Sequence, residues 1–321
     1  MKRSDGFPQI VRFLRNIPVL LFVCAILAVY ALDVCQLVRF AVGVLGDGPA
    51  AHHLTSMPVL ALHAVALIGL LCVGYGYFIE PYRIAVTRIR LRTPKLSRTR
   101  LRIAQITDLH CERKQRNERK LADLINPLEP DLIVFTGDSL NSIAGLERFR
   151  EALATLDARI GKFAVRGNVD DRRYPDVDLF ESTGFRCLSA EAVALEKDNE
   201  TFWLSGVDFR HEDRYREVLE RVPKGCYSAF LCHYPDLIEG LCGINADVYL
   251  AGHTHGGQVR LPLYGALVTF SRYGKRYEAG RYTVGETTLY VNRGVGLEGS
   301  IAPRVRFLCR PEIAVFDIEP A

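Results

Sequence analysis

Residues 132–138 read Leu-Ile-Val-Phe-Thr-Gly-Asp, an uninterrupted apolar run that ends in a glycine and a carboxylate. A run this short and apolar, bounded by turn residues, is typical of a β-strand that is buried on both faces. Gly137 permits the sharp turn that presents Asp138 beyond the end of the strand. We therefore expect Leu132–Phe135 to be a central strand, with Asp138 at its carboxyl end.

Four more apolar runs lead into side chains that can bind a metal ion. Residues 101–106 lead into Asp108 and His110, and residues 163–165 lead into Asn168. Residues 228–231 lead into His233, and residues 247–250 lead into His253 and His255. Stretches with helical spacing lie at residues 117–125, 144–156 and 214–222. Strands that alternate with helices predict a layered α/β domain. In such a domain, side chains that follow the strands gather at the carboxyl ends of the sheet.

The predicted domain extends from residue 101 to residue 321. Further apolar runs at residues 202–207, 289–292 and 313–318 add strands to its second half. No Gly-x-Gly-x-x-Gly motif opens a helix, so a single dinucleotide-binding sheet is not favoured. We expect an α/β fold in which two halves pack as a β-sandwich flanked by helices.

The N-terminal residues 1–80 have a different composition. Residues 17–32 carry no charge, and residues 58–79 are almost wholly apolar. About 20 apolar residues in a helix cross a bilayer. A cleavable secretory signal is the alternative for the first run, but a second apolar run follows it without a convincing cleavage site. We therefore predict a transmembrane helical hairpin, in which Asp33 and His63 are placed to pair near the outer ends.

Residues 81–100 hold seven basic residues and no acidic one. They are interpreted as a basic juxtamembrane linker or as a first edge strand. Basic residues also precede the hairpin, whereas its loop, residues 46–56, has no Lys or Arg. The positive-inside rule then places the domain on the cytoplasmic side of the inner (cytoplasmic) membrane.

The net charge of +4 derives from the segments that flank the membrane. Anionic lipid headgroups are the natural partner of such segments, and nucleic acid is not indicated. The nine cysteines include no Cys-x-x-Cys pair. They are expected to be reduced thiols, which agrees with a cytoplasmic domain. The oligomeric state is left open.

Seven residues from these motifs form the predicted metal site: Asp108, His110, Asp138, Asn168, His233, His253 and His255. Carboxylate, imidazole and amide oxygen together suit Mn, Fe or Zn better than calcium. One shared carboxylate can hold two ions about 3.5–4 Å apart, which acidify a water molecule and neutralise phosphoryl charge.

Taken singly, several of these residues have an ordinary structural reading. Asp108 could cap a helix, Asn168 could form a turn, and His233 could be a hydrogen-bonded core residue. The whole set, placed in order at strand ends, favours two divalent metal ions, with Mn as the first expectation.

The motifs Asp-x-His, Gly-Asp, Gly-Asn-x-Asp, a single His and Gly-His-x-His follow one another in this chain. From about residue 100 onward it resembles the calcineurin-like metallophosphoesterases. The flanks Ala-Gly-His-Thr-His-Gly-Gly-Gln, Tyr-Val-Asn-Arg-Gly-Val-Gly and Cys-Arg-Pro-Glu-Ile resemble the bacterial membrane-tethered branch of that family. The resemblance implies the metallophosphoesterase type of β-sandwich.

The resemblance also implies a division of the ligands. One ion would be bound by Asp108, His110 and His255, and the other by Asn168, His233 and His253. Asp138 would bridge the two ions, and Asp138, Asn168 and His253 would take part in catalysis.

One position departs from the family pattern. Val169 stands where the family commonly has a histidine that is thought to aid the leaving group. A diphosphate bond needs less help of this kind than an ester of a poor alkoxide. The nearby residues Arg113, Arg166, Arg260 and Arg293 are candidate phosphate-binding residues, because arginine binds phosphate in a bidentate manner. Most surface arginines, however, are only solvated.

The expected function is hydrolysis of a phosphodiester or diphosphate bond, by in-line attack of a hydroxide that bridges two metal ions. The membrane tether, the basic stretch and Val169 favour a lipid-linked substrate. The most specific case that the family resemblance implies is UDP-2,3-diacylglucosamine of lipid A biosynthesis, cleaved to lipid X and UMP. A broad-specificity membrane-tethered phosphodiesterase or phosphatase is the first alternative. A catalytically inactive metal-binding regulatory module is the second, although no ligand is missing.

Overall fold

The computed structural model describes residues 9–45, 56–241, 243, 245–298 and 304–321. Its contacts divide the chain into two compact units, Met1–Ile79 and Glu80–Ala321. Each unit has its own architecture, and all the predicted metal ligands belong to the second one.

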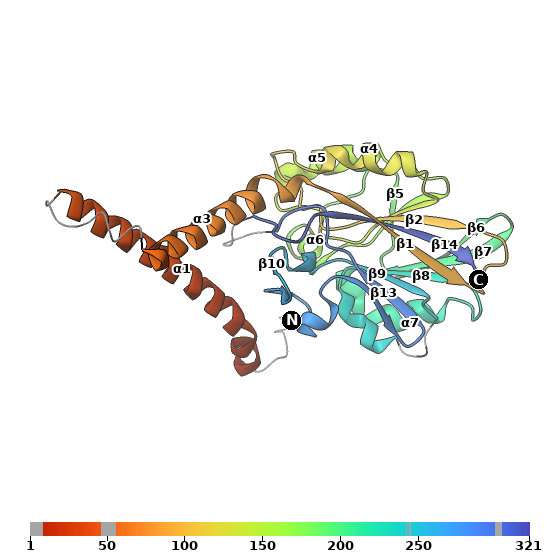
Figure 1. Cartoon of the computed structure of the whole chain (residues 1–321). Helices are drawn as coiled ribbons and strands as arrows, with labels where there is room; N and C mark the ends of the chain where they lie inside the picture. The colour runs from red at the N-terminus through yellow and green to blue at the C-terminus, as the bar shows by residue number, and fades with distance from the viewer. Residues whose placement is uncertain (1–8, 46–55, 242, 244, 299–303) are drawn as a thin grey trace. The chain divides into compact units, whose positions relative to one another are not determined.

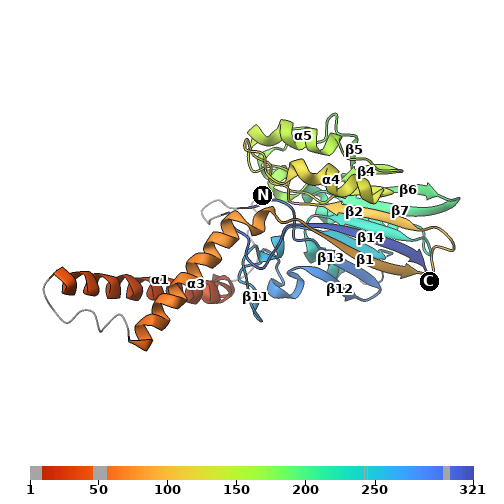
Figure 2. The ribbon, with the colours of Figure 1, turned by 45° about the horizontal axis from the view of Figure 1, so that its top comes forward.

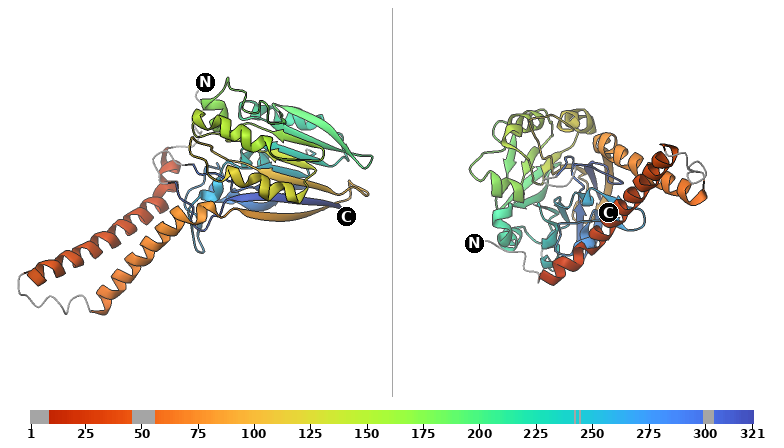
Figure 3. Two further views of the ribbon diagram at one scale, coloured as in Figure 1. Left: turned by 90° about the horizontal axis from the view of Figure 1, so that it is seen from above. Right: turned by 90° about the vertical axis from the view of Figure 1, so that its left-hand side faces the viewer.

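The first unit contains two long helices, α1 (Gln9–Leu45) and α3 (Met57–Phe78). Both are long and apolar enough to cross a membrane, over Ile17–Val44 and Met57–Tyr82. The helices run alongside each other, as Figure 3 shows. Most of their large apolar side chains are exposed, as expected for a surface that lipid covers.

Two polar contacts join α1 to α3. The hydroxyl of Tyr30 donates to the carbonyl oxygen of Ala66 at 3.1 Å. The imidazole Nδ1 of His63 lies 2.5 Å from Oδ1 of Asp33, so the pair expected from the sequence is present. Because residues 30 and 33 meet residues 66 and 63, the two helices are antiparallel, which is the arrangement of a hairpin.

The second unit is a sandwich of two six-stranded sheets. Figure 2 shows β2, β14 and β1 of the first sheet together with β13 and β12 of the second. The first sheet has the order β1 (Ala85–Thr93), β14 (Glu312–Pro320), β2 (Leu101–Ile106), β3 (Leu132–Phe135), β4 (Gly161–Ala164) and β5 (Phe185–Cys187). The second has the order β12 (Gly280–Val284), β13 (Thr287–Val291), β9 (Val248–Ala251), β8 (Ser228–Cys232), β7 (Glu200–Val207) and β6 (Glu191–Lys197). The predicted α/β sandwich is therefore confirmed.

Strand direction brings the ends of the motif-bearing strands together. In the first sheet β2, β3, β4 and β5 are mutually parallel, and in the second β7, β8, β9 and β13 are mutually parallel. The carboxyl ends of parallel strands lie along one edge of a sheet, where ligand sites form. Each sheet therefore offers its own row of strand ends to the site.

Residues 81–100 were left open between a linker and an edge strand. The structure makes Ala85–Thr93 the edge strand β1, which pairs in parallel with β14. The part of this segment that forms β1 is therefore not a linker. Its exposed and buried positions alternate, so Arg88, Arg90 and Arg92 project from its exposed face.

Short helices cover the outer faces of the sandwich. Figure 1 shows α4 (Leu121–Ile125) and α5 (Leu146–Ala154) along one side and α7 (Tyr215–Glu220) along the other. The predicted helices at 117–125, 144–156 and 214–222 are thus shorter than expected, because 3-10 turns replace their first residues. These turns are η2 (Glu118–Lys120), η4 (Ile143–Gly145) and η5 (Phe209–Arg214).

The remaining elements are short. They are α6 (Asn168–Arg173), η1 (Glu80–Tyr82), η3 (Asn126–Leu128), η6 (Pro235–Gly240), η7 (His255–Gly257), η8 (Gly274–Tyr277) and a small hairpin of β10 (Arg260–Leu261) and β11 (Gly265–Ala266). Most of them connect strand ends near the predicted ligands, so they shape the rim of the site.

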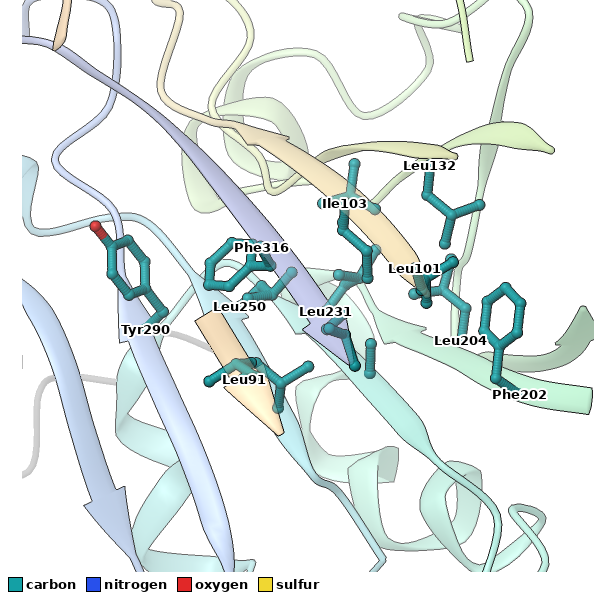
Figure 4. Close-up of a cluster of buried hydrophobic side chains, with 14 of the residues drawn as sticks. Leu91, Leu101, Ile103, Leu132, Phe202, Leu204, Leu231, Leu250, Tyr290 and Phe316 are labelled. Atoms are coloured by element: carbon teal, nitrogen blue, oxygen red, sulfur yellow. The ribbon is translucent and has the colours of Figure 1, made fainter. Parts of the chain in front are cut away.

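The main core lies between the two sheets. Figure 4 shows side chains from both, among them Leu101, Ile103 and Phe316 of the first sheet and Leu231 and Leu250 of the second. All five are essentially inaccessible to water. Burying a leucine or phenylalanine side chain stabilises a fold by about 1.5–3 kcal/mol. This layer therefore fixes the position of one sheet against the other.

A matched pair of leucines tests this assignment. Leu250 is 0% exposed in the core and Leu263, at the tip of the β10–β11 hairpin, is 110% exposed. Leu250→Ala is expected to lower the free energy of unfolding by about 2–5 kcal/mol, because it leaves a cavity. Leu263→Ala is expected to change it by less than about 0.5 kcal/mol. Urea unfolding of the detergent-solubilised protein measures both, and equal losses would contradict the core described here.

Candidate metal centre

Six of the seven predicted ligands form two buried groups, one of Asp108, His110 and His255 and one of Asp138, His233 and His253. Within each group the ligand atoms all lie within 4.8 Å of one another. Asp108, His110 and Asp138 follow β2 and β3 of the first sheet, whereas the three late histidines follow β8 and β9 of the second. The site is thus built where the strand ends of both sheets meet.

In the first group the donor atoms lie close to one another. Oδ1 of Asp108 lies 3.3 Å from Nε2 of His255, and Nε2 of His110 lies 3.0 Å from the same nitrogen. Two imidazole nitrogens that face each other so closely beside a carboxylate fit a shared cation better than they fit each other.

Asp138 joins the two groups. Its Oδ2 lies 3.2 Å from Nε2 of His233 and 3.8 Å from Nε2 of His110, which belongs to the other group. Its Oδ1 accepts a hydrogen bond from the backbone nitrogen of Val169 at 2.9 Å. Asn168, the seventh predicted ligand, directly precedes Val169 and so lies beside Asp138. A bridging carboxylate would occupy this position.

The residues fit divalent cations by a second criterion, namely unsatisfied buried atoms. Oδ1 of Asp108, Oδ1 of Asn168 and Nε2 of His233 are buried without a well-formed hydrogen bond in the described part of the chain, although Asp108 and His233 have ion-pair contacts at 3.3 and 3.2 Å. An unsatisfied buried polar atom costs about 1–3 kcal/mol, and such atoms are rare in folded proteins. Cations at the two groups would satisfy all three atoms, although the ligand assignment stays a prediction.

The opposite ring nitrogen of His233 is already held. Nδ1 lies 2.8 Å from the carbonyl oxygen of Thr136, which turns Nε2 toward Asp138. Metal-binding histidines usually have such a partner, which sets the tautomer and the ring orientation. The imidazole is therefore oriented before any ion binds.

The backbone of the site is conformationally unusual. Five predicted ligands have positive φ values, namely Asp108 (52°), His110 (46°), Asp138 (59°), His253 (72°) and His255 (52°). Non-glycine residues seldom adopt this region, and strain of this kind clusters at functional sites. Gly137 also has a φ of 99°, so it provides the turn predicted after β3. The strain indicates that the fold holds these side chains for function.

Asp170 organises the bridge, a role that the sequence did not reveal. Its carboxylate accepts hydrogen bonds from the backbone nitrogens of Asp138 at 2.9 Å, Ser139 at 2.8 Å and Gly167 at 3.0 Å. Gly167 is required there, because a Cβ would lie 2.6 Å from the backbone nitrogen of Asp138. In the Gly-Asn-x-Asp motif, Asn168 is thus a candidate ligand, Gly167 allows close approach to the Asp138 backbone, and Asp170 holds that backbone in place.

Electrostatics prepares the metal-free site for a cation. Burial raises the pKa of Asp108 to about 7 and lowers the pKa of His110 to about 4 and of His253 to about 3. Burial acts on Asp138 and His233 as well, but their mutual attraction outweighs it. The attraction between the two side chains holds the pKa of Asp138 below its usual value and raises the pKa of His233 to about 10. Most of the imidazoles are therefore neutral, as metal ligands must be.

Three of the four predicted phosphate-binding arginines have internal partners. Arg166 donates to Asp171 and to the carbonyl oxygens of Val177 and Tyr174. Arg260 pairs with Glu278 at 2.8 Å. Arg293 donates to both carboxylate oxygens of Glu312, at 3.1 and 3.0 Å. These contacts favour structural roles for the three residues.

Arg113 is exposed, and its phosphate-binding role stays a prediction. Other charged residues near the centre were missed in the sequence. Oε2 of Glu298 lies 3.7 Å from Nε2 of His255. Arg172, an exposed residue of α6, is close enough to lower the pKa of His253. No motif marks either residue, because their proximity arises only in the folded chain.

Comparison with known proteins agrees with this geometry. Residues 101–257 match the family model of the calcineurin-like phosphoesterases. The chain is 32% identical over 265 residues to the uncharacterized metallophosphoesterase YkuE of Bacillus subtilis, covering 77% of this chain and 90% of that protein. It is 30% identical over 263 residues to the phosphodiesterase YaeI of Escherichia coli, covering 76% and 92% of the two chains.

A more distant relative has a more specific name. The UDP-2,3-diacylglucosamine pyrophosphatase LpxG of Chlamydia trachomatis is 26% identical over 300 residues, covering 74% of this chain and 90% of that protein. In all three comparisons the chain spans most of the relative's length.

Replacing Asp138, the predicted bridging carboxylate, tests the centre. Asp138→Asn is expected to lower turnover of bis-p-nitrophenyl phosphate by more than about 100-fold, beyond what loss of an outer partner costs. It should also lower the bound Mn, measured by elemental analysis, while circular dichroism stays native. Asp317→Asn is the control, because Asp317 pairs with Arg102 on the first sheet. Near-native metal content and activity in Asp138→Asn would remove Asp138 from the bridge.

Metal affinity is expected to depend on pH. In the metal-free site the pKa of His233 is about 10, so the ring holds a proton at neutral pH that a metal ion must displace. The apparent affinity for Mn should therefore rise with pH, about tenfold per pH unit for each proton released. Calorimetry in buffers of different ionisation enthalpy counts the released protons. An affinity that does not change with pH would show that His233 is already neutral.

Proposed function

The chain belongs to the calcineurin-like phosphoesterase family, and on that premise we propose that it hydrolyses a phosphodiester or diphosphate bond of a lipid-linked substrate at the cytoplasmic face of a membrane. The observation that carries the hydrolytic part is the convergence of two buried ligand groups on one oxygen, Oδ2 of Asp138. As a family member the chain is a metal-dependent phosphoester hydrolase. The bond, the substrate and the side of the membrane are the proposal.

The residues of the centre have separable tasks in this proposal. Two divalent cations would supply Lewis acidity and lower the pKa of a water molecule. Asp108, His110 and His255 would hold one cation, and Asn168, His233 and His253 the other. Asp138, which lies near histidines of both groups, would be shared by the two cations, whose chemistry would be activation of water and neutralisation of phosphoryl charge. The identity of the metal is part of the proposal, with Mn expected and Fe or Zn as alternatives.

The leaving group is constrained by Val169. Its side chain is buried, and its backbone nitrogen is bonded to Asp138, so this position supplies no proton donor. An alkoxide leaves poorly without a proton, whereas a phosphate monoester is stable as an anion. The position therefore supports a diphosphate, or a diester with an acidic leaving group, as the substrate.

The candidate membrane spans and the basic residues beside them support the lipid part of the proposal. The first unit offers two helices that could span a bilayer, and β1 directly follows them in sequence. The exposed arginines of β1 would attract anionic headgroups within about a Debye length. Basic residues on both sides of the hairpin support a cytoplasmic location of the second unit.

UDP-2,3-diacylglucosamine is the most specific substrate that fits these constraints. It is a lipid-linked diphosphate, and the name of the LpxG relative specifies its cleavage in that protein. The identity of 26% leaves a broad-specificity phosphodiesterase or phosphatase as the second candidate, which the name of YaeI favours. A regulatory module without activity is less favoured, because all seven ligand positions are filled.

A substrate screen separates the three functions. The Mn-loaded full-length protein in detergent micelles is tested on UDP-2,3-diacylglucosamine, bis-p-nitrophenyl phosphate and p-nitrophenyl phosphate. We expect kcat/KM to be highest for the diphosphate, with UMP as a product. Faster turnover of the simple diester would favour the broad phosphodiesterase. Binding of Mn without turnover of any substrate would leave the regulatory module.

Replacing Val169 tests its proposed effect on the leaving group. Val169→His is expected to raise turnover of alkyl monoesters by at least about tenfold, since a positioned general acid contributes about 10²–10⁴-fold. Turnover of diphosphates should change little. Val169→Leu, which adds volume without a proton donor, is the matched control. A larger gain for diphosphates than for monoesters would refute this view of the position.

A further inference from the structure

A group of large apolar side chains that are close together in sequence lies exposed on the second unit. Its members are Leu263, Tyr264, Val268, Phe270 and Tyr273, which we call the 263–273 patch. Their exposed fractions range from 37% for Val268 to 110% for Leu263. Isolated exposed apolar residues are ordinary, but five within eleven consecutive residues indicate a surface that meets another apolar phase.

Leu263 is the strongest sign that the patch has a function. It occupies the tip of the β10–β11 hairpin with a φ of 63°, a conformation that favours glycine or asparagine. Its side chain is fully exposed, so it contributes no burial to the hydrophobic core. Within the described part of the chain, neither the backbone conformation nor burial explains a leucine at this position, so a partner that covers its side chain has to be sought.

The patch rests on a firm base. Glu278 accepts hydrogen bonds from Arg260 at 2.8 Å and from the backbone nitrogen of Ala266 at 3.2 Å, at the two strands of the hairpin. Asp236 likewise accepts from the Ser271 hydroxyl at 2.6 Å and from the backbone nitrogen of Arg272 at 2.9 Å. Both ends of the patch are therefore anchored to the second unit, and its apolar side chains project from an ordered surface.

The same segment contacts the metal centre. The rings of Phe270 and His253 lie 6.0 Å apart, and the His253 side chain bonds to the backbone of Phe270. The hydroxyl of Thr254 donates to the carbonyl oxygen of Glu278 at 2.7 Å. The patch thus adjoins the rim of the candidate active site, and whatever binds it lies close to a substrate.

The patch segment itself is basic, but carboxylates of neighbouring residues pair with part of it: Glu278 with Arg260 and Lys275, and Glu239 with Arg276. Residues 259–277 contain four basic residues and no acidic one. Arg272 is exposed, and the ammonium of Lys275 lies 4.1 Å from the ring centroid of Tyr264. Exposed leucine and aromatic side chains mixed with basic ones are typical of surfaces that bind the interface of an anionic bilayer.

We propose that the 263–273 patch inserts into the membrane interface and holds the rim of the metal centre at the level of the lipid headgroups. Two candidate membrane spans precede the second unit in the sequence, so a bilayer that they crossed would be near it. The occupant is the bilayer itself, with Leu263 and the aromatic rings among the acyl chains and Arg272 at the phosphates. The inference goes beyond the proposed function, since it concerns a contact surface and not the bond that is cleaved.

Depth-dependent fluorescence quenching tests the proposal on the full-length chain. The only tryptophan of the sequence is Trp203, so Trp203→Phe gives a silent background. Leu263→Trp reports on the patch, and Glu220→Trp, at an exposed position of α7, is the matched control. Both proteins are placed in nanodiscs of brominated phosphatidylcholine with about one-third phosphatidylglycerol, an anionic lipid.

We expect the indole at position 263 to be blue-shifted and to lose most of its emission to the brominated chains, while the indole at position 220 keeps its emission. Equal emission at the two positions would overturn the proposal. A blue shift without quenching would also overturn it, because another protein surface, such as a second copy of the chain, would then cover the patch. Neither result depends on turnover, so failure here is distinguishable from failure of the proposed function.

A second variant separates docking from folding. Leu263→Asn places a residue that tolerates positive φ at the hairpin tip, so the unfolding midpoint should stay unchanged or rise. If the patch docks, a Val268→Trp reporter in the same background should lose part of its quenching when Leu263→Asn is added. Quenching that is unchanged by Leu263→Asn would show that Leu263 does not enter the bilayer.

Discussion

The site depends on one carboxylate that faces ligands from both sheets. Asp138 follows β3 of the first sheet, and its Oδ2 lies 3.2 Å from Nε2 of His233, which follows β8 of the second. Glycine at 167 allows this approach, and Asp170 fixes the Asp138 backbone. A shift of one sheet against the other would separate His233 from Asp138, since the two residues follow strands of different sheets. The packing of the sandwich is therefore a condition for the chemistry.

That condition explains why the chain accepts local costs at the centre. Five candidate ligands have positive φ, and several of their polar atoms are buried without a well-formed hydrogen bond. Each feature costs free energy that the inter-sheet core, with residues such as Phe316 and Leu250, must offset. Binding of cations would recover part of the cost, since these oxygen and nitrogen atoms would become ligands. The arrangement of the site would therefore lower the free energy of unfolding of the metal-free protein, and metal binding would raise it again.

The features that could contact a membrane are distributed along the chain. Two apolar helices could span a bilayer, β1 presents arginines, and the proposed docking patch adjoins the metal centre. These features use different forces: burial of apolar helices, long-range attraction to headgroups, and shallow insertion of a few side chains. A tether alone restricts the second unit to the membrane neighbourhood, whereas a docking surface beside the centre would also set its orientation toward a lipid substrate.

The sequence by itself determined the local elements and the chemistry of the site. A continuous apolar run predicted β3 and a largely apolar one predicted β2, both with their observed bounds, and the residues after the strands named all the candidate ligands. Half-exposed strands such as β6, with Glu191 and Lys197 at its ends, lacked that signal and were missed. Only the tertiary structure decided which partner each charged residue has: Arg293 meets Glu312, and Asp170 meets the backbone of Asp138. Hydrophobic periodicity is encoded among neighbours in sequence, whereas ion pairs and exposed patches arise when distant segments pack, so no local pattern records them.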